Sequence, residues 1–229
     1  MQGDLLSYLK KRYEENQTRK SGPGPVITIS REYGCPAKLV AQKLSVILSE
    51  MKNENGDKYS WKWYSKEILD ESAKQLQMDP SKIKYVFDYE KRGSFEDFFG
   101  SFSSYYQSDK KIRATIGKVI RDIAVQGHSI IVGRGGIAIT RDIANSLHIN
   151  LEAPLEWRTV RLSQRYDLSL EKAKTCAIET DKHRKEFRDY FEGKNTDYTK
   201  FDVTFNCMTL TVDEIVATIV KTVELRKFI

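Results

Sequence analysis

The chain has 229 residues, a hydrophobic fraction of 40% and a net charge of +6, which describe one folded domain able to bury its core without disulfides or metals. The sequence holds no apolar run of the roughly 20 residues that span a membrane, and no apolar segment of the kind that directs secretion. Its three cysteines (Cys35, Cys176, Cys207) lack CxxC spacing, which favours a reducing cytoplasm over a disulfide framework or a zinc site. Three scattered histidines predict no metal site, and the positive charge favours an anionic partner, either a polymer or a phosphorylated small molecule.

The N-terminal segment predicts a helical arm that precedes the folded domain. Apolar residues recur at helical spacing over residues 4–19, and the glycines and prolines of Ser21–Pro25 interrupt the pattern. We therefore expect residues 1–24 to form an arm and residues 25–229 a single domain. A β-branched run at 26–30 then predicts a buried strand, followed by a helix over 37–51.

The middle of the chain predicts a strand, three helices and a long insertion. Alternating aromatic residues favour a strand over 59–64, and a helix is expected over 66–76, before a turn at Asp79–Pro80. Within residues 81–110, aromatic residues recur at helical spacing: Phe95, Phe98, Phe99, Phe102 and Tyr106. This pattern favours a helix whose aromatic face packs in the core or in a dimer. A surface on which bases stack is the less favoured interpretation. The next helix covers 111–126 and ends at Gly127.

The C-terminal half alternates strands with helices. Strands are expected at 128–132, 147–153 and 201–206, and helices at 155–165, 170–191 and 212–223, the last with Thr211 as its N-cap. This alternation predicts an α/β fold with a mostly parallel sheet. Ligands of such sheets bind at the carboxyl ends of the strands, so the residues that directly follow each strand are the candidates for a site.

Three segments at those positions carry residues suited to phosphate groups. The turn before the helix at Ala37 offers free backbone N–H groups to an anion. Arg134 stands among glycines at a strand end, where a guanidinium can donate two hydrogen bonds to a phosphate. Arginines share helical faces at Arg158, Arg161 and Arg165, and again, beside Asp181, at Arg184 and Arg188. Clustered arginines suit phosphoryl transfer, because its transition state spreads negative charge.

The order of these segments resembles the cytidylate kinase-like family of P-loop nucleoside-monophosphate kinases. The resemblance rests on ITISREYG, WYSKEIL, IIVGRGG, LEAPLEWRTVRL, the Asp181–Arg184 pair and FDVTFN with TVDEIV, and it covers most of the chain from Val26 onward. It implies a three-layer α/β/α core with a five-stranded parallel sheet. It also implies an NMP-binding insertion at about 79–110 and a mobile lid at about 162–185.

The resemblance further implies roles for individual residues. Residues 31–38 would form the phosphate loop, with binding contacts from Ser30, Glu32, Tyr33, Gly34 and Cys35. Arg158 and Arg161 would reach the phosphates as catalytic residues from the base of the lid. Arg134, Asp181 and Arg184 would bind the acceptor, and Asn206 would lie near the donor base. ATP and Mg²⁺ would serve as co-substrate and cofactor, although no metal-ligating residue is predicted.

The phosphate loop departs from the P-loop pattern G-x-x-x-x-G-K-[ST]. In that frame Pro36 replaces the second glycine, Ala37 the lysine and Lys38 the hydroxyl residue that holds Mg²⁺. The usual catalytic ammonium is therefore missing from its place. Lys38 from one side of the loop, or Arg31 from the other, is the candidate replacement.

Three functions remain open on the sequence. The first is an active kinase that transfers a phosphoryl group from ATP to a nucleoside monophosphate of the CMP type or a related small acceptor. The second is a catalytically impaired relative that binds a nucleotide or phosphate as a sensor or interaction module. The third, a nucleic-acid-binding protein, is disfavoured because no RNA or DNA motif is present. The arm and the aromatic residues would each suit a homodimer.

Overall fold

The structure is a computed structural model that describes Ser7 and residues 22–83, 106–192 and 200–229. The predicted N-terminal arm, apart from Ser7 and residues 22–24, and most of the predicted insertion lie outside the described residues. The aromatic residues from Phe95 to Phe102 lie outside them as well. Within the described ranges, none of the helices combines the length and apolar character that a bilayer crossing requires.

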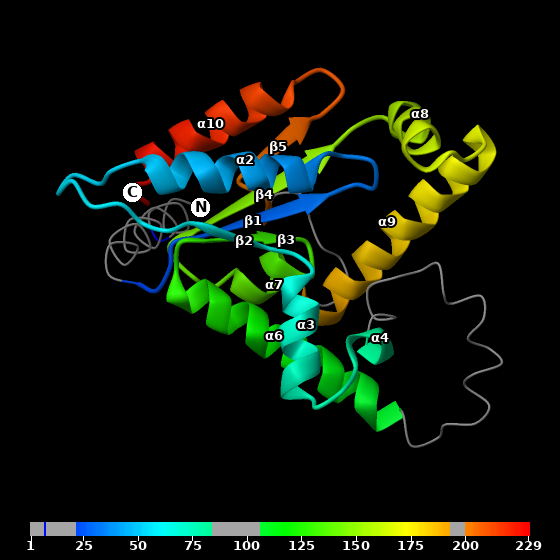
Figure 1. The fold of residues 1–229 in the computed structure, drawn as a ribbon, viewed down its shortest axis with the longest axis horizontal. Helices are drawn as coiled ribbons and strands as arrows, with labels where there is room; N and C mark the ends of the chain where they lie inside the picture. The colour runs from blue at the N-terminus through cyan, green and yellow to red at the C-terminus, as the bar shows by residue number, and fades with distance from the viewer. Residues whose placement is uncertain (1–6, 8–21, 84–105, 193–199) are drawn as a thin grey trace.

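Five parallel strands form one sheet in the order β2-β3-β1-β4-β5 (Figure 1). The strands are β1 (Val26–Arg31), β2 (Lys62–Tyr64), β3 (Ser129–Val132), β4 (Ser146–Glu152) and β5 (Val203–Asn206). In the central strand β1, Val26, Ile27 and Ile29 are fully buried. A parallel sheet is covered on both faces, which is why β1, β3 and β4 read as nearly continuous apolar runs.

Helices cover both faces of the sheet and form the predicted three layers (Figure 1). One face carries α2 (Ala37–Glu50) and α10 (Val212–Leu225), and the other carries α3 (Glu67–Gln75), α6 (Tyr106–Gln126) and α7 (Gly136–Thr140). The first face buries Leu44, Leu48 and Ile219 against the sheet. The second buries Ile116, Ile120 and Ile131. The predicted α/β/α architecture is therefore confirmed.

Two further helices stand at the carboxyl ends of the strands. These are α8 (Leu155–Tyr166) and α9 (Leu170–Glu192), which follow β4 and pack on each other beside the sheet (Figure 1). A small apolar cluster of Leu162, Ala173 and Ala177 holds them together, and Tyr33 packs against it. Because Tyr33 follows β1, the helix pair is fastened to the loop at the end of the central strand.

The structure differs from the predicted elements at several boundaries. The strand expected over 59–64 pairs with β3 only from Lys62, because the N–H of Trp61 donates to Ser49 Oγ at 2.9 Å. Helix α4 (Pro80–Ile83) begins where a turn was predicted, since proline suits the first helical position. Helix α6 begins at Tyr106, five residues earlier than expected.

Helix α7 was not predicted at all. It follows the left-handed residues Gly133, Arg134 and Gly135, and no element was predicted between the strands at 128–132 and 147–153. Five residues are too few to show helical periodicity in the sequence. Its buried Ile137 and Thr140 are ordered by packing on the sheet.

Candidate functional site

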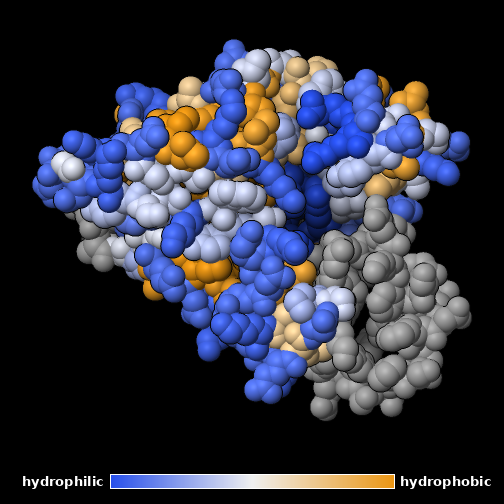
Figure 2. Space-filling view, in the orientation of Figure 1, coloured by the Kyte–Doolittle hydropathy of each residue, from blue (hydrophilic) through white to orange (hydrophobic). Residues whose placement is uncertain are grey.

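A cavity of about 1220 Å³ opens at the carboxyl ends of the strands. It lies between the loop after β1, the turn after β3 and the helix α9, and strongly hydrophilic residues surround the hollow in Figure 2. Most of the predicted site residues line it: Ser30, Arg31, Glu32, Tyr33, Gly34, Cys35, Lys38, Arg134, Arg161, Asp181 and Arg184. Arg158 and Asn206 are not among the lining residues. Tertiary structure therefore gathers residues from four separate segments into one wall: residues 30–38, Arg134, Arg161, and Asp181 with Arg184.

The loop after β1 is held to the neighbouring strand β4 by Glu32. Its backbone N–H donates to the carbonyl oxygen of Leu151 at 3.0 Å, and its carboxylate accepts the N–H of Ala153 at 2.9 Å. The same carboxylate oxygen lies 3.2 Å from Nε of Arg158. Glu32 is thus a structural anchor of the loop as well as part of the cavity wall.

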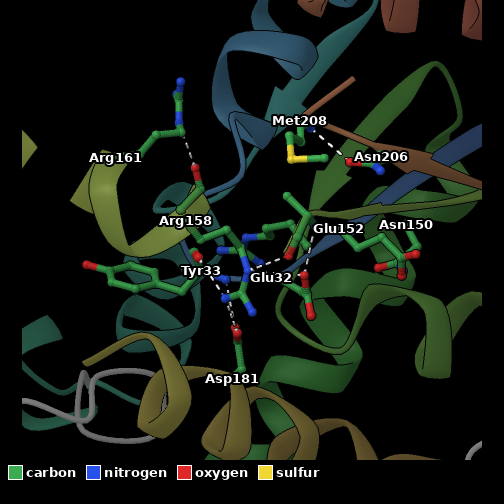
Figure 3. A network of polar contacts seen from close by, with 12 residues as sticks. Glu32, Tyr33, Asn150, Glu152, Arg158, Arg161, Asp181, Asn206 and Met208 are labelled. Carbon is green, nitrogen blue, oxygen red and sulfur yellow. Dashed lines mark hydrogen bonds and ion pairs between the residues drawn. The ribbon is translucent and has the colours of Figure 1, made fainter. Parts of the chain in front are cut away.

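Arg158 and Asp181 clamp the loop from the side of α8 and α9 (Figure 3). Arg158 is 6% exposed and donates to the carbonyl oxygens of Ala153 and Tyr33 and to Asp181 Oδ2, the last at 2.7 Å. The other carboxylate oxygen of Asp181 accepts the backbone N–H of Tyr33 at 2.7 Å. Burial raises the pKa of Asp181, while the Tyr33 N–H and the nearby Arg184 and Arg158 act in the opposite direction. An internal carboxylate therefore occupies a loop N–H that would face a phosphate in an open phosphate loop.

Three guanidinium groups converge on the opposite side of the loop. Burial lowers the pKa of Arg31 well below its usual value, and the nearby charges of Arg184 and Arg134 lower it further. Within the described part of the chain, the Arg31 guanidinium makes no hydrogen bond or ion pair. Arg184 donates to the carbonyl oxygen of Arg31 at 3.2 Å and lies 3.6 Å from Asp181, and Arg134 donates to Ser65 at 3.4 Å. Mutually repelling cations around one carboxylate favour the entry of an additional anion.

Glycine is required where Arg31 crosses the turn after β3. Gly133 has a φ of +71°, and a Cβ atom built on it would lie 1.6 Å from Nη1 of Arg31. Any larger residue would occupy the place of the guanidinium. The glycine-rich turn therefore makes room for an arginine from another strand, in addition to exposing Arg134.

The start of α2 lies on the cavity as well. Pro36 is its N-cap, and the N–H of Ala37 donates back to Cys35, so these two residues offer no free N–H to a ligand. The N–H groups of Lys38 and Leu39 make no bond to any described residue. The Lys38 side chain is exposed at the cavity. The first turn of α2 therefore keeps two donors and one ammonium for an anion.

The remaining predicted residues lie farther from the cavity or at its rim. Arg161 donates to the carbonyl oxygen of Gly34 at 3.3 Å, and its guanidinium lies 4.7 Å from the ring centre of Trp157. Asn206 ends β5, where its side-chain oxygen accepts the N–H of Met208 at 2.9 Å (Figure 3). The roles assigned to these residues and to Arg158 stay predictions.

The cavity wall also contains cations that were not assigned to the site from the sequence. These are Lys66, Arg165, Lys182, Lys185 and Arg188. With the five predicted cations they make ten Lys and Arg side chains against two carboxylates, an excess larger than the chain's net charge of +6. Arg165 and Arg188 belong to the predicted arginine clusters, and Lys182 and Lys185 to the basic stretch from Arg158 to Arg188. Lys66 lies two residues after β2, at the carboxyl end of a strand. Asn150 on β4 also lines the cavity and is buried; its signal was a polar residue inside an apolar strand.

The described residues do not form a dedicated Mg²⁺ site. Mg²⁺ requires oxygen ligands, usually one or two carboxylates together with substrate phosphates. The two carboxylates of the cavity wall, Glu32 and Asp181, are both bonded to Arg158. No group of three or more His, Cys, Asp or Glu side chains suited to a metal occurs among the described residues.

Comparisons with known proteins agree with this arrangement. The model of the cytidylate kinase-like family matches residues 26–209. An uncharacterized protein from Eubacterium ventriosum is similar in structure, with 24% identity, a TM-score of 0.61, and coverage of 87% of this chain and 98% of that chain. Shikimate kinase from Acinetobacter baumannii, solved with shikimate, has 12% identity and a TM-score of 0.50, covering 93% of this chain and 98% of its own. No curated protein sequence matches the chain significantly.

Proposed function

Because the chain belongs to the cytidylate kinase-like family, we propose that it transfers a phosphoryl group from ATP to a nucleoside monophosphate of the CMP type or a related small phosphorylated acceptor. The observation that carries this proposal is the convergence of Arg31, Arg134 and Arg184 on one cavity. Guanidinium groups donate paired hydrogen bonds to phosphate oxygens. Their mutual repulsion is relieved when a phosphate enters between them.

The donor phosphates bind at the first turn of α2 in this proposal. The free N–H groups of Lys38 and Leu39, at the positive end of the helix dipole, donate to the phosphate oxygens. The Lys38 ammonium and the Arg161 guanidinium add positive charge beside them. Lys38 and Arg31 take over the charge of the P-loop lysine, whose place Ala37 occupies. Asn206 contacts the donor base, and Cys35 and Gly34 complete the loop.

The acceptor phosphate binds on the opposite side of the loop, at Arg134 and Arg184, and Asp181 is a further contact for another part of the acceptor. An ionised phosphate acceptor needs no general base, so catalysis consists of alignment and charge stabilisation. Arg158 acts as a positioning residue, because its bonds to Glu32, Tyr33 and Asp181 hold the loop in place.

We assign residues 1–24 to an arm, about 79–110 to the acceptor-binding insertion and about 162–185 to the lid. The three free thiols favour the cytoplasm as its compartment.

A specific observation favours a second function, a catalytically impaired nucleotide-binding relative. The Asp181 carboxylate occupies the N–H of Tyr33, and Pro36 and Ala37 supply neither a free N–H nor an ammonium. A loop that is closed by its own carboxylate can still bind a phosphate at the arginine side. Such a protein would bind CMP or ATP without transfer.

The test is ADP release from Mg-ATP with CMP, dCMP, UMP, AMP, GMP or no acceptor. The proposal expects turnover with one or a few acceptors. Arg31→Ala should lower kcat/KM by roughly 100-fold, because a charge that stabilises the transferred group is lost. Arg161→Ala should lower it as well and excludes a contaminating kinase as the source of activity.

Arg121→Ala is the matched control for these variants. Arg121 loses the same charge, but it is exposed on α6 and paired with Asp142 at 2.6 Å, away from the cavity wall. Wild-type rates are expected for this variant. Stabilisation by CMP or ATP without turnover would select the impaired relative instead. A protein that neither turns over nor binds these nucleotides would contradict both functions, and salt-sensitive binding to arbitrary oligonucleotides would support the third.

A further inference from the structure

Two cysteines from distant parts of the chain meet beside the phosphate loop. Cys35 belongs to the loop and lines the cavity, whereas Cys207 is buried directly after β5. Cys35 packs against the core cluster that includes Cys207, and the two thiols are hydrogen-bonded to each other. Both are free thiols.

Their meeting is determined by backbone bonds to the strand between them. Strand β4 separates β1 from β5, and adjacent strands lie roughly 4.8 Å apart, so the loop after β1 must cross the end of β4 to reach Cys207. Glu32 makes this crossing through its bonds to Leu151 and Ala153. The N–H of Cys207 donates to the carbonyl oxygen of Glu152 at 2.8 Å. Cys207 is therefore bonded to the end of β4 directly, and Cys35 indirectly, since its N–H donates to the carbonyl oxygen of Glu32 at 3.2 Å.

The surroundings of the two thiols shift their pKa values in opposite directions. The hydrogen bond from Cys35 lowers the pKa of Cys207, and the positive charge of Arg161 lowers it further, against the effects of burial, Glu32 and Glu152. The same hydrogen bond, with burial, raises the pKa of Cys35. The two thiols also differ in access, because Cys35 lines the cavity whereas Cys207 is buried, so a peroxide in the cavity meets Cys35 first.

We propose that Cys35 and Cys207 form a reversible oxidation site, in which a peroxide joins the two sulfur atoms and ties the phosphate loop to the end of β5. The Cys35 sulfur attacks one peroxide oxygen and loses its proton, and the O–O bond breaks to give a sulfenic acid on Cys35 and a hydroxide that is protonated to water. The Cys207 sulfur, whose own pKa is lowered, then attacks the Cys35 sulfur and displaces the second oxygen as water. The two sulfurs give up two electrons in total, and an added dithiol returns them.

The regulatory consequence rests on the proposed function. The proposed donor site uses the N–H groups of Lys38 and Leu39, which follow Cys35 by three and four residues, and Cys35 itself lines the cavity. A covalent bond from Cys35 to Cys207 would draw this loop toward β5 and shift those N–H groups away from the phosphates. The oxidised protein is therefore expected to bind nucleotide with lower affinity than the reduced protein.

The bond itself is tested on the reduced full-length chain with hydrogen peroxide, followed by mass spectrometry of its peptides. The wild type should lose two hydrogen atoms and yield one linked peptide that contains Cys35 and Cys207, and dithiothreitol should reverse the change. Cys35→Ser and Cys207→Ser should form no such link, whereas Cys176→Ser should behave as the wild type. Separate sulfinic acids in the wild type, or a link through Cys176, would overturn the proposal.

The consequence is tested by titrating CMP and ATP into the same samples. Oxidation should weaken binding by roughly tenfold in the wild type and in Cys176→Ser. It should leave Cys35→Ser at the affinity of its own untreated form. A linked protein with unchanged affinity would overturn the regulatory role. A reduced protein that binds neither nucleotide would instead count against the proposed function, because the linked peptide is measured independently.

Discussion

Arg158 and Arg31 illustrate two different uses of an arginine beside one phosphate loop. Arg158 donates to two carbonyl oxygens and pairs with two carboxylates, so its charge is already compensated by the groups that hold the loop. Arg31 is surrounded by Arg134 and Arg184, and burial and both neighbours lower its pKa. Arg31 lines the cavity, and the repulsion by two neighbouring cations is offset only by the charge of Asp181, which is the physical reason to expect a phosphate at Arg31 and not at Arg158.

Gly133→Ala tests whether the position of Arg31 matters for binding. The new Cβ would lie 1.6 Å from Nη1 of Arg31, so the guanidinium must move. We expect CMP and ATP to bind at least roughly tenfold more weakly, measured by calorimetric titration. The free energy of unfolding should also fall by about 1–2 kcal/mol, because alanine is strained at positive φ.

Gly56→Ala separates these two effects. Gly56 also has a positive φ, of +86°, but no atom lies within 4 Å of a Cβ built on it. This variant should lose a similar amount of stability and keep the wild-type affinity. Equal affinities for both glycine variants would show that the place of Arg31 beside Gly133 is not needed for the ligand.

The two helices that cover one face of the sheet begin in different ways. Helix α2 starts at Pro36 without a side-chain cap, and its first turn keeps free N–H groups at the cavity. Helix α10 does not line the cavity and starts with a complete capping box, in which Thr211 accepts the N–H of Glu214 and Glu214 accepts the N–H of Thr211. The helix that serves the site thus leaves open what the purely structural helix satisfies internally.

Thr211→Ala measures the contribution of that cap. Loss of the threonine oxygen should lower the free energy of unfolding by about 1 kcal/mol, read from urea denaturation. Thr218→Ala is the matched control on the same helix, because its exposed hydroxyl bonds only the preceding turn, at Glu214. Alanine favours helix interiors, so this control should be neutral or slightly stabilising. A Thr211→Ala variant as stable as Thr218→Ala would contradict the importance of the cap.

At the scale of the whole molecule, a buried polar network links the sheet to the C-terminal helix. His148 on β4 contacts Thr28 on β1 at 2.7 Å and Ser146 at 3.1 Å through its two ring nitrogens. Its backbone N–H donates to Asp202, which in turn pairs with Arg226 after α10. Burial lowers the pKa of His148 to about 4, and the charges of Asp202, Arg226 and Arg141 act on it in opposing directions.

This network predicts a loss of stability in mild acid. The unfolded chain protonates His148 near its ordinary pKa of 6.5, whereas the folded chain resists protonation down to about 4. The unfolded state therefore binds more protons between these values, and stability falls as the pH falls. The free energy of unfolding should drop by about 2 kcal/mol between pH 7 and pH 5 on account of His148.

Urea denaturation at the two pH values checks this expectation. His148→Asn should remove most of the difference, although it costs stability at both pH values. His183→Gln, at a position on α9 where the imidazole pairs with Glu186, should retain the difference. A wild-type difference that survives in His148→Asn would assign the acid sensitivity to other groups, such as His128, whose pKa burial also lowers.

The sequence by itself determined the layers of the fold and the segments of the site. Apolar runs at 26–30, 128–132 and 147–153 alternate with amphipathic helices. This pattern suffices to predict a parallel sheet, because the spacing of apolar residues within each element shows which of its faces is buried. The candidate residues could be placed at the carboxyl ends of strands for the same reason. Short elements such as α7, and the exact start of β2, depended on packing and on single hydrogen bonds to distant residues.

Only the tertiary structure decided which of the candidate residues face a ligand. Arg158 and Arg161 lie three positions apart on one helix, yet one is buried under the loop and the other lines the cavity. Sequence spacing places side chains on a face of a helix, but it does not reveal what that face meets. The bond from Tyr33 to Asp181, the passage of Arg31 over Gly133 and the meeting of Cys35 with Cys207 each join residues far apart in the chain. Such contacts follow from the order of strands in the sheet, which no local pattern encodes.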